Sequence, residues 1–269
     1  MPRDEITPTG SFARASLPAP QDSCFGLREG IHLYHNRSSF HFPTIVIGEI
    51  AGPRTFPLGP FQPLGKYSML PIMNDPPMIS RSPELMSRSD SALLVVDVQE
   101  KLVPAIRAAA RIVWNVRRLI DGANLLGLPV VASEQYPQGL GPTVPELASR
   151  LEHRPAKLAF SCRALPELFA DFRQRNIEKL LVCGIETHVC IQQTVLDLLA
   201  DGWRVYVAVD AVGSRHDLDH QTALRRMESS GAVLTTTEAA LFEWCQAAGT
   251  PEFKQISRIV RENAPIAEN

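Results

Sequence analysis

The stretch that decides the fold is Lys179–Leu199, KLLVCGIETHVCIQQTVLDLL. Leu180–Cys183 reads as a buried strand, and Gly184 as a tight turn after it. The apolar residues that follow recur at helical spacing: Ile191, Val195, Leu198 and Leu199. Cys190 falls in the first turn of this predicted helix, where unpaired backbone N–H groups and the helix dipole favour negative charge and a lowered thiol pKa. The stretch therefore predicts a strand–turn–helix unit that carries a candidate nucleophile.

Similar units lie on both sides of this stretch. The other predicted strands are Ala92–Val96, Pro129–Ala132, Ala156–Phe160, Arg204–Val209 and Ala232–Leu234. Helical patterns separate them, and Gly127, Gly202 and Gly231 each stand between a helix and a strand, where a left-handed cap is common. Short alternation of strand and helix implies right-handed crossovers. We therefore predict a three-layer α/β/α fold around a six-stranded, mostly parallel sheet.

The carboxyl ends of the predicted strands carry reactive side chains. In open α/β sheets this is the edge where ligands bind. Asp97, Glu134, Lys157, Cys190 and Asp210 stand at or near these ends. An acid, a lysine and a cysteine from three strand ends can converge on one crevice. The segment after the first strand has no glycine-rich phosphate fingerprint, so dinucleotide binding is not predicted.

Composition narrows the class of protein. The chain has 269 residues, 45% of them hydrophobic and 21% charged, with a net charge of −2. Such a charge provides no electrostatic footprint for nucleic acid or a membrane surface. No apolar run is long enough to span a bilayer, and no signal segment is evident. The five cysteines are scattered without CxxC spacing, so we expect reduced thiols and a cytoplasmic location.

The chain divides into three parts by composition. Residues 1–85 hold 13 of the 22 prolines and keep no period for long. We expect a disordered, Pro-rich extension or a mis-assigned start with Met78 or Met86 as the true one; a transit peptide fits less well because the segment contains acidic residues. Residues 86–250 form the predicted domain, and 251–269 a C-terminal tail.

Four segments resemble the isochorismatase-like cysteine hydrolase superfamily, and within it the isochorismatase domain-containing proteins of unknown substrate. They are LLVVDVQEKL (Leu93–Leu102), EQYPQGLGPTVPEL (Glu134–Leu147), KLAFSC (Lys157–Cys162) and GIETHVCIQQTVLDLLADG (Gly184–Gly202). The resemblance covers about 89–247. It implies an isochorismatase-like hydrolase domain that acts on a small molecule and commonly forms homodimers or larger homo-oligomers.

The resemblance also implies an Asp–Lys–Cys triad, which falls on Asp97, Lys157 and Cys190. Cys190 would attack a carbonyl carbon and form a thioester. Asp97 would take the thiol proton and return it to the leaving amine, and Lys157 would hold the carboxylate. Relatives have a non-proline cis peptide before the nucleophile, here Ile185–Glu186. The backbone N–H groups of Glu186 and Cys190 would then form an oxyanion hole.

Departures from better-known relatives narrow the reaction. Nicotinamidases carry an Asp-x-His metal motif after the second strand, but Ser133–Gly141 contains neither residue. We therefore expect no metal, no other cofactor and no nicotinamidase activity. True isochorismatases split a vinyl ether without a nucleophilic cysteine, so Cys190 favours hydrolysis of an amide-like C–N bond or a related carbonyl compound. The alternatives are a catalytically idle interaction protein, a vinyl-ether hydrolase, and a thiol redox sensor that pairs Cys190 with Cys162.

Other residues near the motifs are candidates for the pocket wall. They are Gln99, Glu134, Tyr136, Phe160 and His188. His188 invites a Cys–His dyad, but residues two apart on a helical turn do not face each other, so we place it at the rim or at a subunit interface. Asp210 and Arg215 are expected to cap or pair locally.

Overall fold

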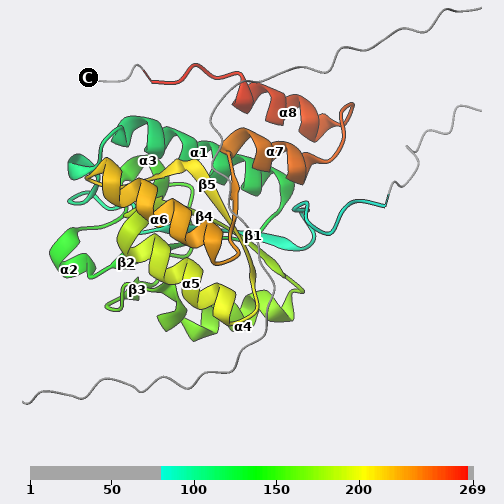
Figure 1. The fold of residues 1–269 in the computed structure, drawn as a ribbon. Helices are drawn as coiled ribbons and strands as arrows, with labels where there is room; N and C mark the ends of the chain where they lie inside the picture. Colours follow the sequence, from blue (N-terminus) through cyan, green and yellow to red (C-terminus); the bar gives the residue numbers. More distant parts are fainter. Residues whose placement is uncertain (1–79, 266–269) are drawn as a thin grey trace, which may run out of the picture. The chain divides into compact units, whose positions relative to one another are not determined.

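Six parallel strands form the centre of the described part of the chain, residues 80–265 of the computed structural model (Figure 1). The strands are β1 (Ser91–Val96), β2 (Val130–Gln135), β3 (Ala156–Lys157), β4 (Lys179–Ile185), β5 (Arg204–Gly213) and β6 (Val233–Thr235). Their spatial order is β3-β2-β1-β4-β5-β6, and each neighbouring pair runs parallel. The predicted six-stranded α/β fold is confirmed.

Helices cover both faces of the sheet (Figure 1). One face carries α1 (Ala109–Leu126), α7 (Thr237–Cys245) and α8 (Pro251–Val260); the other carries α4 (Pro166–Gln174), α5 (Gln192–Ala200) and α6 (Asp217–Ser229). Short helical segments occupy the connections: η1 (Val103–Ala105), α2 (Pro137–Leu140), α3 (Pro145–Ala148), η2 (Cys162–Ala164) and η3 (Thr187–Ile191). Within residues 80–265, no helix combines the length and the apolar character needed to cross a membrane.

Side chains of β1 alternate between two hydrophobic cores. Leu93 and Val95 pack in the core beneath α1, whereas Leu94 and Val96 pack in the core beneath α4 and α5. All six residues of this strand are buried. A strand that is covered on both faces has no solvent side, which explains why its sequence is an almost continuous apolar run.

Gly184 lets β4 pass close to β1 just before η3, the segment that carries Cys190. Its φ is +117°, and a Cβ at this position would lie 2.1 Å from the carbonyl oxygen of Val96. Any other residue would meet both a backbone clash and a conformation that side chains disfavour. The glycine predicted as a turn residue therefore lies within the strand and permits a close backbone approach.

The third strand is shorter than predicted. It comprises Ala156 and Lys157 and does not continue to Phe160. The chain turns after Lys157, so that the carbonyls of Ala159 and Phe160 accept hydrogen bonds from the Lys157 ammonium at 3.3 and 2.8 Å. These two carbonyls therefore satisfy a buried ammonium and do not continue the hydrogen bonding of the sheet.

The segment expected to be a C-terminal tail begins with a helix, and this corrects the sequence interpretation. Thr250 caps α8 by accepting a hydrogen bond from the Phe253 N–H, and Ile256 is fully buried. Arg118 of α1 donates to the carbonyls of Ile259 and Val260. A Thr-Pro start and apolar residues at helical spacing are the signals that would have predicted this helix.

The predicted N-terminal extension lies outside the described residues, apart from 80–85. The carbonyl of Leu85 accepts a hydrogen bond from Lys179 at 2.8 Å, and that of Glu84 accepts one from the Tyr206 hydroxyl at 2.6 Å. Met86 is fully buried. Contacts with the domain thus begin slightly before the boundary predicted at residue 86.

Candidate active site

Asp97, Lys157 and Cys190 lie together at the carboxyl edge of the sheet. Asp97 follows β1, Lys157 ends β3, and Cys190 belongs to η3, the turn after β4. Their exposed fractions are 0%, 4% and 5%. Besides burial, the negative charge of Asp97 acts on the Cys190 thiol and raises its pKa. The order β3-β2-β1-β4 explains the gathering, because it brings the ends of β1 and β4 side by side on one edge and separates the end of β3 from them by β2 alone.

Lys157 is fully occupied by acceptors. Its Nζ lies 2.7 Å from Asp97 Oδ2 and 2.7 Å from Gln135 Oε1, and it donates to the carbonyls of Phe160 and Ala159. The side chains of Lys157 and Asp97 are both completely buried. An ammonium has three N–H donors and no lone pair. Lys157 therefore acts as a fixed positive charge and has neither a proton nor a lone pair to spare for chemistry.

The second oxygen of Asp97 is also held. Ser133 Oγ lies 2.7 Å from Asp97 Oδ1. The sheet register brings this contact about, because Val96, the residue before Asp97, pairs with Ser133 on β2. Asp97 itself has a φ of +52°, which turns the chain out of β1 at this point. The carboxylate is thereby fixed from two sides, by a serine and by a lysine.

Gln135 links the lysine to the rest of the edge. It pairs with Lys157 in the parallel ladder between β2 and β3 and accepts its Nζ proton. Gln99 in turn accepts from the Gln135 N–H at 2.7 Å and donates to the carbonyls of Gln135 and Gly141. Gln99 is fully buried. Its role in the structure is to tie the end of β2 to the segment after β1.

Burial raises the pKa of the Cys190 thiol, and the adjacent Asp97 carboxylate raises it further, while the Lys157 charge acts in the opposite direction. The sequence argument from a helix terminus predicted a lowered pKa, and this expectation is wrong. The Lys157 charge is already balanced by Asp97, so burial dominates. Cys190 is consequently a neutral thiol at rest, and its proton must be removed before it can act as a nucleophile.

The turn that carries Cys190 is a π-helical segment, which runs directly into α5. The peptide bond between Ile185 and Glu186 is cis. The Glu186 carbonyl accepts from the N–H groups of Val189 and Ile191 at 3.1 and 3.2 Å, which closes the turn. Glu186 and Cys190 thus lie on one short, internally bonded segment.

Side chains from the β5–α6 region bind three successive residues of this segment. Arg215 Nε lies 2.7 Å from the Glu186 carboxylate, His220 Nδ1 lies 2.9 Å from Thr187 Oγ1, and Ser214 Oγ lies 3.0 Å from His188 Nδ1. We call Ser214, Arg215 and His220 the clamp. Burial lowers the pKa of His220. Arg215 was expected to pair locally, and its partner is instead 29 residues away.

The remaining predicted pocket residues are Glu134, Tyr136, Phe160 and His188, and their surroundings differ. Glu134 accepts two hydrogen bonds from Thr143 and is thus engaged within the fold. Tyr136 and Phe160 each expose 51% of their surface. His188 Nε2 lies 3.8 Å from Glu186 and 3.9 Å from Asp219, so this ring is directed toward the clamp region. Within residues 80–265, no group of three or more His, Cys, Asp or Glu side chains is placed to hold a metal ion.

Ser133 and Gln135 are site residues that the sequence reading missed. Both lie at the end of β2, where Ser133 pairs with β1 and Gln135 pairs with β3. Alternate residues of a strand point to the same face, so the pair at 133 and 135 could have been placed beside the strand-end acid and lysine. No comparable sequence pattern marks the clamp residues, because their partners in the turn after β4 are 26 to 33 residues away in the chain.

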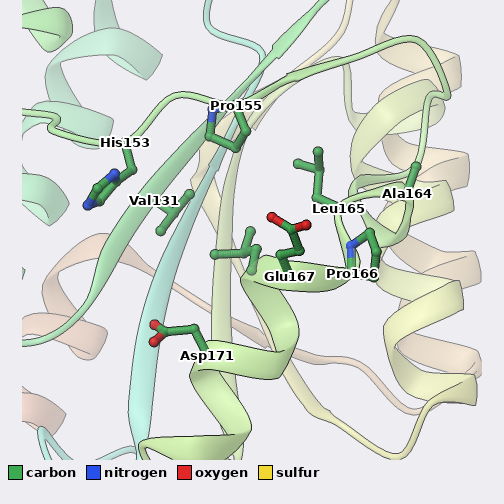
Figure 2. Close-up of a pocket in the computed structure, with 9 residues that line it drawn as sticks. Val131, His153, Pro155, Ala164, Leu165, Pro166, Glu167 and Asp171 are labelled. Atoms are coloured by element: carbon green, nitrogen blue, oxygen red, sulfur yellow. The ribbon is translucent and has the colours of Figure 1, made fainter.

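A cavity of about 640 Å³ lies away from these residues, beside β2 and α4. Figure 2 shows Val131, Pro155 and Leu165 on its wall, with the carboxylates of Glu167 and Asp171 from α4. Asp97, Lys157 and Cys190 are not among its lining residues. The cavity is therefore separate from the candidate active site.

An acid, a lysine and a cysteine thus gather at the carboxyl edge of a parallel sheet, as the resemblance to isochorismatase-like α/β proteins implied. The isochorismatase domain model matches residues 91–239. The chain belongs to the isochorismatase family. It is 42% identical over 176 residues to isochorismatase domain-containing protein 2A of Mus musculus, covering 65% of this chain and 84% of that protein. For protein 2 of Homo sapiens the identity is 43% over 176 residues, covering 65% and 85%.

Solved structures show the same fold. The MAR1 ribonuclease from Caenorhabditis elegans is 39% identical, with a TM-score of 0.63 over 68% of this chain and 95% of that one. A protein described as a putative MAR1 ribonuclease from Leishmania donovani is 33% identical, with a TM-score of 0.62 over 68% and 98%.

Proposed function

We propose that this protein is a metal-independent cysteine hydrolase that acts on a small amide-like or related carbonyl substrate through a thioester on Cys190. The observation that carries the proposal is the buried Asp97 carboxylate, which is fixed by Lys157 at 2.7 Å and lies beside the Cys190 thiol. A neutral thiol next to a fixed carboxylate is a nucleophile with its base in place.

The acylation half of the reaction follows from this arrangement. Cys190 Sγ attacks the carbonyl carbon while its proton passes to Asp97, and the carbonyl π electrons move to oxygen. The N–H groups of Glu186 and Cys190 stabilise that oxyanion. When the oxyanion collapses, the C–N bond breaks and the departing nitrogen takes the proton from Asp97. The products of this half are an amine and a thioester on Cys190.

Water completes the cycle by the same groups. Asp97 takes a proton from the attacking water, a second oxyanion forms at the same place, and the C–S bond breaks. The sulfur recovers the proton, and a carboxylic acid leaves. Lys157 keeps its bonds throughout, so the carboxylate need not move between the two halves. The scheme requires neither a metal ion nor a cofactor.

The main test is a panel of small amides and esters, assayed with the wild type and with Cys190→Ala. We expect turnover only in the wild type, and intact-mass spectrometry should trap an acyl adduct on Cys190. Cys245→Ser, which alters a partly exposed thiol, is the matched control and should retain activity. A Cys190 that is neither acylated nor alkylated by iodoacetamide at any pH would rule the proposal out.

The same panel separates the alternatives. A vinyl-ether substrate would be cleaved equally by Cys190→Ala, and an idle interaction protein would bind a partner equally well in both forms. RNA belongs in the panel because two relatives are named as ribonucleases; the net charge of −2 argues against it. A redox sensor would show a Cys162–Cys190 disulfide on mild oxidation, which non-reducing peptide mapping detects.

We further propose a cytoplasmic homo-oligomer. Cys162, Cys183, Cys190 and Cys245 are free thiols, as in a reducing compartment. The apolar side chains of Leu158 and Leu218 are 76% and 74% exposed, and their burial against a second subunit would stabilise an oligomer. Light scattering of the purified protein tests self-association, and a monomer at micromolar concentration would contradict it. Cell fractionation tests the location.

A further inference from the structure

A serine and a cysteine that take no part in the proposed reaction converge on its base. Ser133 Oγ lies 2.7 Å from Asp97 Oδ1, and Cys162 Sγ lies 3.3 Å from the same serine oxygen. Their exposed fractions are 1% and 0%. Ser133 comes from β2 and Cys162 from η2. Two separate elements thus meet behind the carboxylate, on the oxygen that Lys157 does not bind.

The chemistry of these groups sets the direction of each hydrogen bond. A carboxylate can only accept, so the Ser133 hydroxyl donates to Asp97. The lone pairs of the serine oxygen then accept the S–H of Cys162. Cys162 is held in place through its backbone N–H, which donates to Thr194 Oγ1 of α5 at 2.9 Å. The donors therefore run in one direction, from Cys162 to Ser133 to Asp97.

We propose that Ser133 is a positioning residue that keeps Asp97 ionised and oriented as the general base, and that Cys162 holds Ser133 in its donating orientation. This inference rests on the proposed function. A hydrogen bond to the ionised form of an acid favours that form. The ionisable groups that face Asp97 are Lys157 from β3, Cys162 from η2 and Cys190 from η3, and Ser133 supplies a neutral donor among them.

The test follows the alkylation of Cys190 by iodoacetamide as a function of pH, read by mass spectrometry of the peptide that contains Cys190. The acidic limb of this profile reports protonation of the base that accepts the thiol proton. We expect Ser133→Ala to move this limb to higher pH by about one unit, a roughly tenfold slower reaction on the limb. Looser packing alone would change the rate at every pH without moving the limb.

A matched serine serves as the control. Ser91 is fully buried at the opposite end of β1, and its hydroxyl donates to Asp90 Oδ1 at 2.8 Å. Ser91→Ala should leave the limb in place. Cys162→Ala should move the limb in the same direction as Ser133→Ala but less far. Cys162→Ser retains a donor and should leave it unmoved.

The outcomes decide between two separate failures. A wild-type limb in Ser133→Ala, or an equal displacement in Ser91→Ala, overturns the role of Ser133. If Ser133→Ala does not fold, the decision passes to Cys162→Ala, and an unmoved limb there overturns the inference. A wild-type Cys190 that never reacts refutes the hydrolase and the inference with it. A reactive wild type with an unmoved limb in Ser133→Ala refutes the inference alone.

Discussion

At the scale of single residues, the buried ion pair between Lys157 and Asp97 bears on the stability of the fold and on the proposed chemistry. Two charges removed from water are tolerable only while each compensates the other. The same pair keeps Asp97 beside the thiol and keeps the lysine protons engaged. Substitutions at these positions therefore have to be compared singly and together.

Lys157→Met should destabilise the protein by about 3–5 kcal/mol, because it leaves a buried carboxylate without its counter-charge. Lys157→Met combined with Asp97→Asn removes both charges and should recover most of this loss. Urea unfolding of the three proteins measures the difference. The pair has no such coupling if the double variant is less stable than Lys157→Met alone.

The raised pKa of Cys190 predicts an alkaline loss of stability. In the unfolded chain a thiol ionises at about pH 8.5, whereas Cys190 in the folded protein retains its proton to higher pH. The stabilising contribution is therefore complete below that pH and falls above it, by about 1.4 kcal/mol per pH unit for one thiol. Cys190→Ser should remove this share of the decline. The test is the unfolding free energy of both proteins across alkaline pH. Equal slopes against pH for the wild type and Cys190→Ser would contradict the prediction.

At the scale of elements, the clamp connects α6 and the end of β5 to the nucleophile turn. It binds Glu186, Thr187 and His188 in succession, directly before the residues that lead to Cys190. Glu186 provides one of the two proposed oxyanion donors. In the proposed mechanism the clamp would affect the step in which negative charge develops on oxygen, and this step can be measured apart from the reactivity of the thiol.

Arg215→Ala should lower amide turnover by about tenfold to a hundredfold, because a misplaced oxyanion donor stabilises the transition state less. Alkylation of Cys190 by iodoacetamide forms no oxyanion and should be unchanged. The control for both assays is Arg107→Ala, which breaks an exposed ion pair with Asp217 at the start of α6. Equal losses in turnover and alkylation would show that Arg215 supports the whole turn instead.

The sequence predicted elements well where one local pattern decides them. β1 and β4 are apolar because both of their faces are buried, and the positions of Asp97 and Cys190 after these strands follow from that. It failed where contacts made only in the folded chain decide. The ammonium of Lys157, buried against Asp97, also bonds the carbonyls of Ala159 and Phe160. Burial raises the pKa of the Cys190 thiol, and the clamp bonds the turn after β4. The helix α8 is different, since its Thr250 cap was readable and was missed.

At the scale of the whole molecule, the start of the domain is joined to two neighbouring strands of the sheet and to one helix that covers it. Residues 83–86 bind Lys179 of β4 and Tyr206 of β5, and the Met86 N–H donates to Glu243 of α7. The predicted boundary at residue 86 therefore runs through a packed segment. Residues 84 and 85, which the sequence assigns to the Pro-rich extension, therefore pack with the domain.

A chain that begins at residue 80 should be more stable than one that begins at residue 87. The shorter chain loses the buried Met86 side chain and the acceptors of Lys179, which should cost about 2–5 kcal/mol. Thermal and urea unfolding of the two chains measures the difference. Indistinguishable stability would show that residues 83–86 are not part of the packed domain.

The bonding of Lys157 also has a consequence for chemical selectivity. Aldehydes and activated esters modify amines that can release a proton and present a lone pair, and the buried Lys157 ammonium can do neither while its acceptors surround it. Exposed lysines would consume such reagents first. Reagents aimed at the candidate active site should therefore carry a thiol-directed electrophile, and amine-directed labelling should map the surface while leaving Lys157 unmodified.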